Sequence, residues 1–196
     1  MAITSVLLDL DGVIRHFDPE RRAAIEARHG LSADTLWSTA FGEDLATAAV
    51  TGILTRAQWI DEIAARVGSR SAVSEWLSDR GAADEAMLVE CDRLRAAGYT
   101  VAILTNGTDT IAEEMAELGI DRRVDAVFNT WDIGYAKPDP RAFRHCCSAL
   151  GVDPTNVFFT DDSESKLAGA VEIGMIARRF VGIDSFRRDL VEVGIG

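Results

Sequence analysis

Five short apolar segments, separated by helical patterns, constrain the fold of this chain more than any other feature. Each is rich in branched or aromatic residues, and they lie at 6–13, 100–104, 126–129, 156–160 and 175–180. Helical patterns such as 84–97 and 108–118 separate them. Strands that alternate with helices pair in parallel and are covered on both faces. The pattern therefore predicts an α/β fold, a Rossmann-like parallel sheet with helices on both faces.

The stretch from residue 15 to residue 84 departs from this alternation, because helix start and stop signals follow one another within it. Asp18 before Pro19 is typical of a helix start, and Thr55 with Gln58 forms a capping box. We expect helices from Pro19 to Gly30, from Ser32 onward, at 43–50, from Arg56 to Gly68 and at 72–78. The sequence therefore predicts an all-helical insertion.

The insertion lies between the first and second strands, at the carboxyl-terminal edge of the sheet. In doubly wound sheets this edge carries the ligand crevice. We predict an α/β core formed by 1–14 and 85–196, and a helical cap formed by 15–84. The cap is expected to lie over the site as a lid.

An excess of acidic residues argues against two classes of partner. The chain has 20 Lys and Arg against 32 Asp and Glu, and its formal net charge is −12. A surface of this sign repels the phosphates of nucleic acids and anionic lipids. We therefore expect neither nucleic acid nor membrane as a partner.

The sequence also favours a cytoplasmic location. Residues 1–10 lack the basic segment of a signal peptide, and no run of about 18 apolar residues is present. Cys91, Cys146 and Cys147 lack the spacing of a metal site and are expected to be reduced, packed thiols.

Lysine is almost absent from the chain. Of the 20 basic residues 18 are Arg, and the two lysines are Lys137 and Lys166. Lysine is a compact point charge that suits a single phosphoryl oxygen, whereas Arg presents a planar fork. Both lysines are therefore candidates for a functional site, against the alternative that a biased composition left two by chance.

Polar groups follow four of the predicted strands where each ends. In chain order they are Asp9 with Asp11, Thr105 with Asn106, Lys137, and Asp161 with Asp162. Because the carboxyl ends of parallel strands lie at one edge of a sheet, these side chains are expected to meet there. The turn at 105–108 also offers backbone amides at the start of a helix, and such amides bind phosphate.

In this order and with these residue types, the four groups resemble the motifs of the haloacid dehalogenase-like (HAD) hydrolase superfamily. Its first motif, an apolar strand followed by Asp-x-Asp-Gly, matches 7–13, and its second, a Thr or Ser after a strand, matches Thr105. Its third, a Lys often followed by Pro, matches Lys137, and its acidic fourth motif matches 161–162. The helical block resembles the C1-type cap of the phosphatase-type subfamily, so the resemblance covers the whole chain.

The resemblance implies a phosphatase that works through an aspartyl-phosphate intermediate. Asp9 would attack phosphorus, which splits one displacement into two easier steps. Asp11 would protonate the leaving alkoxide and then take a proton from the hydrolytic water. Thr105, Asn106 and Lys137 would bind phosphoryl oxygens and offset the charge of the transition state.

The resemblance also implies Mg²⁺ as a cofactor and a small phosphorylated metabolite as the substrate. The ion would be held by the Asp9 carboxylate, the backbone carbonyl of Asp11 and Asp162, with Asp161 as a further candidate. Sugar phosphates and related monoesters are the implied substrates, because a closing cap excludes phosphoproteins.

Asp11 separates two reactions within the superfamily. The dehalogenase branch lacks an acid at this position, because a departing halide needs no proton. The resemblance therefore favours hydrolysis of phosphate esters over dehalogenation. A sugar phosphomutase of the same fold would use the same residues and stays an alternative.

The fourth motif departs from the superfamily pattern at Lys166, which falls where Asn or a second Asp is usual. A cation there would weaken metal binding or pair with Asp161 or Asp162, unless it faces solvent on a helix. A catalytically weak HAD-fold binding protein is therefore a further alternative.

Two sets of residues near the predicted site are assigned to structure rather than to chemistry. Trp37, Trp59 and Trp76 lie in the predicted cap, where helix-spaced Trp is expected to pack between helices, with stacking on a substrate as the alternative. Arg15 and His16 follow the first motif and are expected to be solvated hinge residues.

Overall fold

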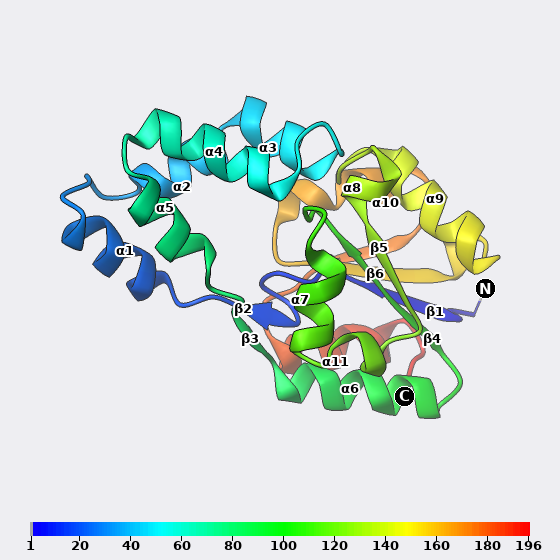
Figure 1. Ribbon diagram of the computed structural model, residues 1–196. Coiled ribbons are helices and arrows are strands. Elements are labelled where there is room, and N and C mark those ends of the chain that lie inside the picture. The colour runs from blue at the N-terminus through cyan, green and yellow to red at the C-terminus, as the bar shows by residue number, and fades with distance from the viewer. Residues whose placement is uncertain (1) are drawn as a thin grey trace.

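A five-stranded parallel sheet lies at the centre of the computed structural model, which describes residues 2–196 (Figure 1). The strand order is β5-β4-β1-β6-β7. The strands are β1 (Ser5–Leu8), β4 (Thr100–Thr105), β5 (Ala126–Asn129), β6 (Val157–Asp161) and β7 (Ile176–Arg179). The predicted α/β fold with a parallel sheet is confirmed.

Helices cover both faces of this sheet. One face packs against α6 (Glu85–Ala96), α7 (Ile111–Glu117) and α11 (Ile183–Glu192), and the other against α9 (Pro140–Leu150) and α10 (Ala168–Glu172). Shorter elements are α8 (Thr130–Ile133) and the 3-10 turns η1 (Asp121–Arg123), η2 (Pro154–Asn156) and η3 (Glu164–Lys166). Over residues 2–196, no helix has the length and apolar character needed to span a bilayer.

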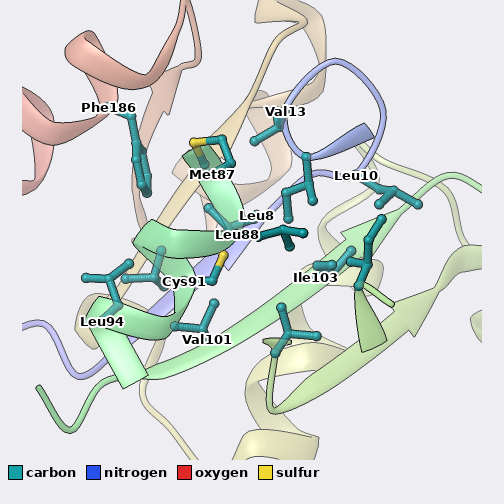
Figure 2. Close-up of a cluster of buried hydrophobic side chains, with 14 of the residues drawn as sticks. Leu8, Leu10, Val13, Met87, Leu88, Cys91, Leu94, Val101, Ile103 and Phe186 are labelled. Carbon is teal, nitrogen blue, oxygen red and sulfur yellow. The ribbon is translucent and has the colours of Figure 1, made fainter. Parts of the chain in front are cut away.

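The alternation of side chains along β1 divides the core into two layers. Val6 and Leu8 point into the layer under α6 and α11, and Leu7 points into the opposite layer. Figure 2 shows Leu8 beside Leu88 and the free thiol of Cys91 on α6. Because β1 is buried on both faces, its end is a rigid position for the first aspartate.

The five helices α1 (Pro19–Arg28), α2 (Thr35–Ala40), α3 (Glu43–Val50), α4 (Arg56–Val67) and α5 (Arg70–Leu77) form the helical insertion. They lie to one side of the sheet (Figure 1) and enclose a hydrophobic cluster of their own. The two connections to the sheet run side by side, because β2 (Arg15–His16) pairs antiparallel with β3 (Ala82–Ala83). The predicted division at 14/15 and 84/85 falls next to this pair.

Local side-chain caps start several helices of the insertion, but not α2. Asp18 caps α1, and Thr55 with Gln58 forms the predicted capping box of α4. The start of α2 at Ser32 was wrong: the helix begins three residues later. The carboxylate of Glu26 on α1 accepts from the N–H groups of Asp34 and Leu36, at 3.0 and 2.8 Å, so a residue of another helix sets this boundary.

A glycine in α10 allows close packing against the loop that carries Lys137. A Cβ at Gly169 would overlap the carbonyl oxygen of Pro138. Gly169→Ala is expected to lower the free energy of unfolding by about 1–3 kcal/mol, because the loop or the helix must shift. Ala168→Ser, at the exposed neighbouring position, should change it by less than about 0.5 kcal/mol. Urea denaturation of both variants tests this, and equal effects would contradict it.

Candidate active site

A cavity of about 760 Å³ lies at the carboxyl ends of β1, β4 and β6 and is bounded on its other side by the helical insertion. Its volume is in the range of small-molecule sites. The structure brings every predicted site residue to its lining, namely Asp9, Asp11, Thr105, Asn106, Lys137, Asp161, Asp162 and Lys166. These side chains therefore lie together at one edge of the sheet, as expected from their positions at the strand ends.

Lys137 joins the two buried carboxylates of the cavity. Its Nζ donates to Oδ1 of Asp9 at 2.6 Å and to Oδ2 of Asp161 at 2.7 Å. All three side chains are buried, and that of Lys137 is only 2% exposed. Two carboxylates this close repel each other, and the ammonium between them offsets that repulsion.

Burial and charge shift the pKa values of this group. Burial is the main cause that raises the pKa of Asp9 to about 7, and the charges of Asp161 and Asp11 add to it against the opposing effect of Lys137. Burial lowers the pKa of Lys137, but the attraction of Asp9 and Asp161 outweighs it and raises that pKa above its ordinary value. Lys137 therefore remains charged at neutral pH.

Two polar side chains hold the backbone of Lys137 in place. The side chain of Asn106 donates to the Lys137 carbonyl oxygen at 3.0 Å and accepts from the Lys137 N–H at 2.8 Å. Nζ of Lys166 donates to the same carbonyl oxygen at 3.2 Å. The amide of Asn106, predicted to bind phosphate, is thus already engaged.

The geometry of Lys166 differs from two of the sequence interpretations, an ion pair with the aspartates and a solvent-facing position. Within residues 2–196, Lys166 forms no ion pair with Asp161 or Asp162, and it is half-buried rather than solvent-facing. It supports the loop of the other lysine. The two lysines that stand out in the composition therefore meet at one place.

The turn after β1 depends on a glycine. The carbonyl oxygen of Leu10 accepts from the N–H groups of Val13, Ile14 and Arg15, which folds the chain back tightly. Gly12 has φ of 88°, and a Cβ there would overlap the carboxylate of Asp162. The glycine after Asp11 therefore permits both the turn and the approach of Asp162.

Arg15 is a buried partner of Asp11, so its expected assignment as a solvated hinge residue was wrong. Its Nε donates to Oδ1 of Asp11 at 2.6 Å, and its Nη2 donates to Oδ2 at 3.1 Å. Its Nη1 donates to Glu114 on α7 at 2.7 Å. The turn that follows Gly12 brings Arg15 back over Asp11, and sequence spacing alone does not show this.

Glu114 connects Arg15 to the helical insertion. Its Oε1 accepts from Nη1 of Arg80 at 2.6 Å and from the hydroxyl of Thr110 at 2.7 Å, and it lies 3.6 Å from Nη1 of Arg56 at the start of α4. Glu114 was not among the residues predicted for the site. The sequence feature that could have identified Glu114 is its position three residues after Ile111, which places a charged residue on the buried face of a helix.

The carboxylates of the cavity form a donor set suited to a hard cation. Asp9, Asp161 and Asp162 each offer a carboxylate oxygen, and these oxygens lie within 4.8 Å of one another. Both oxygens of Asp161 already accept hydrogen bonds, from Lys137 and from the N–H of Ser163. Oxygen donors of this kind fit Mg²⁺, and Asp9 with Asp162 are better placed than Asp161 to hold it.

A match to a family model decides what kind of protein this site belongs to. The model of the haloacid dehalogenase-like hydrolases matches residues 3–174. The chain belongs to this family. It is 37% identical over 84 residues to (S)-2-haloacid dehalogenase 4A of Burkholderia cepacia, a match that covers 42% of this chain and only 36% of that protein.

Two further proteins, one by sequence and one by fold, match over nearly the whole chain. The chain is 27% identical over 205 residues to Validoxylamine A 7'-phosphate phosphatase of Streptomyces hygroscopicus subsp. limoneus, which covers 95% of this chain and 94% of that protein. Its fold is similar to a HAD family enzyme of Bacteroides thetaiotaomicron, solved in complex with magnesium and inorganic phosphate. The TM-score is 0.75 at 24% identity, covering 91% of this chain and 94% of that one.

The raised pKa of Asp9 predicts how the stability of the metal-free protein changes with pH. The folded protein keeps the Asp9 proton up to about pH 7, whereas an unfolded aspartate loses it near pH 4, so the folded state binds more protons in that window. The Asp9 contribution to the free energy of unfolding therefore falls as pH rises from about 4 to 7, by at most about 1.4 kcal/mol per pH unit.

Urea denaturation in chelator at pH 5 and pH 7 measures this contribution. The wild type should lose more stability over that interval than Asp9→Asn, which lacks the titrating group. The same pH dependence in both proteins would contradict the assignment.

The buried Arg15–Glu114 pair predicts a large double-mutant coupling. Arg15→Met should lower the free energy of unfolding by about 3 kcal/mol, because it leaves a buried carboxylate short of a partner. The cycle with Glu114→Gln should give a coupling of about 1–3 kcal/mol. The exposed pair Arg70–Asp61 is the matched control and should give at most about 0.5 kcal/mol. Couplings of the same size at both pairs would disprove the buried network.

Proposed function

We propose that this HAD hydrolase is a Mg²⁺-dependent phosphatase that hydrolyses a small phosphorylated metabolite through an aspartyl-phosphate on Asp9. The observation that carries the proposal is Asp11, a carboxyl group that lines the same cavity as the buried Asp9–Lys137 pair. A departing alkoxide needs an acid, and a departing halide does not. The relative named as a phosphatase also matches nearly the whole chain.

The first half-reaction uses the strand-end groups together. A carboxylate oxygen of Asp9 attacks phosphorus, and the bond from phosphorus to the ester oxygen breaks. Asp11 gives its proton to that oxygen, and the alcohol leaves. Thr105, the backbone amides after it and the Lys137 ammonium stabilise the charge on the remaining phosphoryl oxygens.

The second half-reaction returns the enzyme to its starting state. Asp11, now a carboxylate, takes a proton from water, and the water oxygen attacks the phosphorus of the aspartyl-phosphate. The bond between phosphorus and the Asp9 oxygen breaks, which releases inorganic phosphate and regenerates the Asp9 carboxylate.

Mg²⁺ would be held by Asp9, Asp162 and the backbone carbonyl of Asp11. When bound, the ion supplies positive charge that offsets the negative charge of the phosphoryl group. The carboxylates of the site otherwise repel a phosphate dianion, and Lys137 offsets part of their charge.

Arg15 adds a positioning requirement to this scheme. Both oxygens of Asp11 accept hydrogen bonds from Arg15, so the acid step requires at least one of them to leave Arg15 and turn toward the substrate. Arg15 is tied through Glu114 to Arg80, and Glu114 also lies 3.6 Å from Nη1 of Arg56 on α4. We propose that residues 15–84 act as the cap and that this network couples the cap to Asp11.

A sugar phosphomutase stays an alternative, because it needs the same residues. It would transfer the phosphoryl group from Asp9 to a second hydroxyl of a sugar phosphate instead of to water. The alternative of a catalytically weak binding protein depended on Lys166. That support is weakened, because Lys166 donates to the Lys137 backbone.

Phosphate release from alkyl phosphate esters tests the proposed function. The wild type should release phosphate with Mg²⁺ and lose this activity in chelator. Asp9→Asn should be inactive, and Asp11→Asn should lower kcat by about 10²–10⁴-fold because the general acid is lost. Thr51→Ala, at a cap residue outside the cavity, should be unchanged.

Two added reactions separate the alternatives. Halide release from a 2-haloacid with no phosphate release would establish a dehalogenase and contradict the proposal. Isomerisation of a sugar phosphate in the presence of a bisphosphate, without phosphate release, would establish the mutase.

A further inference from the structure

Three aromatic side chains face the cavity without any part in the chemistry proposed above. Phe17, Trp37 and Phe41 line the cavity and are 45%, 49% and 44% exposed. Large aromatic side chains contribute most to the free energy of folding or binding when they are buried. Apolar surface left open inside a concave site marks the place where a ligand covers it. The same cavity contains Asp9 and Lys137, so this ligand is the substrate.

The rings of Trp37 and Phe41 form an aromatic wall on the insertion. The ring centroids of Trp37 and Phe41 are 4.2 Å apart, and Phe41 meets Trp59 and Trp76 edge-on at 5.9 and 6.4 Å. Trp59 is 5% exposed and packs in the core of the helical insertion, as expected from its helical spacing. Trp37 departs from that expectation, because about half of its surface is open.

The insertion and its connections present several polar side chains to the cavity. These side chains already have hydrogen-bond partners. Arg56 donates to the carbonyl oxygen of Leu77. Asp79 accepts from the N–H of Gly81, and Asp18 accepts from an N–H at the start of α1. A sugar needs free groups for its hydroxyls, because a buried hydroxyl without a partner costs binding free energy. The exposed rings of Phe17 and Phe41 offer no such group and suit an apolar leaving group instead.

Arg22 adds one unused donor beside the aromatic wall. Its guanidinium carbon lies 5.2 Å from the ring centroid of Trp37. Its buried Nε has no hydrogen-bond partner among residues 2–196. Because Nε is buried, a ligand reaches it only if Arg22 moves, and the guanidinium otherwise contributes a cation–π contact to Trp37.

We propose that Phe17, Trp37 and Phe41 bind the leaving group of the substrate, and that this leaving group carries a planar aromatic ring. The proposal rests on the proposed function, because it places the phosphate at Asp9 and Lys137. A ring that packs on Trp37 and Phe41 buries apolar surface on both sides of the contact and gains the offset or edge geometry that aromatic pairs prefer. The substrate class is then phosphate monoesters of aryl-bearing alcohols rather than sugar phosphates.

Three primary alkyl phosphates with similar leaving oxygens test this assignment: 2-phenylethyl phosphate, ethyl phosphate and ribose 5-phosphate. With Mg²⁺, kcat/KM for the phenylethyl ester should exceed that of the other two by at least about tenfold, equivalent to about 1.4 kcal/mol. Trp37→Ala should lower kcat/KM for the phenylethyl ester much more than for ethyl phosphate, and so remove most of this preference. Ile53→Ala, an exposed apolar position of the insertion outside the cavity, is the control and should keep the preference.

Trp37→Leu, which keeps an apolar side chain but no ring, separates loss of the aromatic surface from loss of folding. It should melt within a few degrees of the wild type and still lose most of the preference. Equal or better turnover of ribose 5-phosphate by the wild type would overturn the assignment and leave the phosphatase proposal standing.

Calorimetry distinguishes failure of the phosphatase proposal from failure of the proposed aromatic site. If no ester is hydrolysed, the phosphatase proposal fails, and binding of the phenylethyl and ethyl esters decides the substrate class. At least about tenfold tighter binding of the phenylethyl ester, lost in Trp37→Ala, supports the aromatic site without turnover. Equal binding of the two esters overturns it.

Discussion

The ion pairs of Lys137 with Asp9 and Asp161 are the interactions on which the rest of the site depends. A buried charge is costly, and one buried partner left alone destabilises a protein strongly. The three groups come from β1, from β6 and from the loop after α8, so the adjacency of β1 and β6 must be right for them to meet. The hydrogen bonds of Asn106 and the close approach of Gly169 then fix the loop of the lysine.

The fold and the position of the site were predictable, because local signals and the pairing of parallel strands determine them. Apolar segments and helix caps are local signals, so the strand at 126–129 and the helix capped by Thr55 appear where expected. Parallel strands bring their carboxyl ends together, which gathers the site residues without further information. The beginning of α2 and the partner of Asp11 were not predictable, because Glu26 and Arg15 act through contacts that only the folded chain creates.

The edge of the sheet and the helical insertion have different proposed roles. The edge of the sheet holds the carboxylates and the ammonium, and we propose that it performs the phosphoryl chemistry. The helical insertion contributes apolar rings, and we propose that it selects the leaving group. Arg15 and Glu114 lie where the two parts join, and their ion pairs give the insertion a physical connection to the acid Asp11. A movement of the insertion would therefore change the position of Asp11, because ion pairs connect the two.

The most direct test of the central claim is to locate the phosphoryl group during turnover. Enzyme mixed with Mg²⁺ and an alkyl phosphate that it hydrolyses would be quenched in acid within a turnover and mapped by mass spectrometry. The account predicts one phosphoryl group on Asp9, absent from Asp9→Asn. A phosphoryl group on a different residue, or hydrolysis by Asp9→Asn at the wild-type rate, would contradict it.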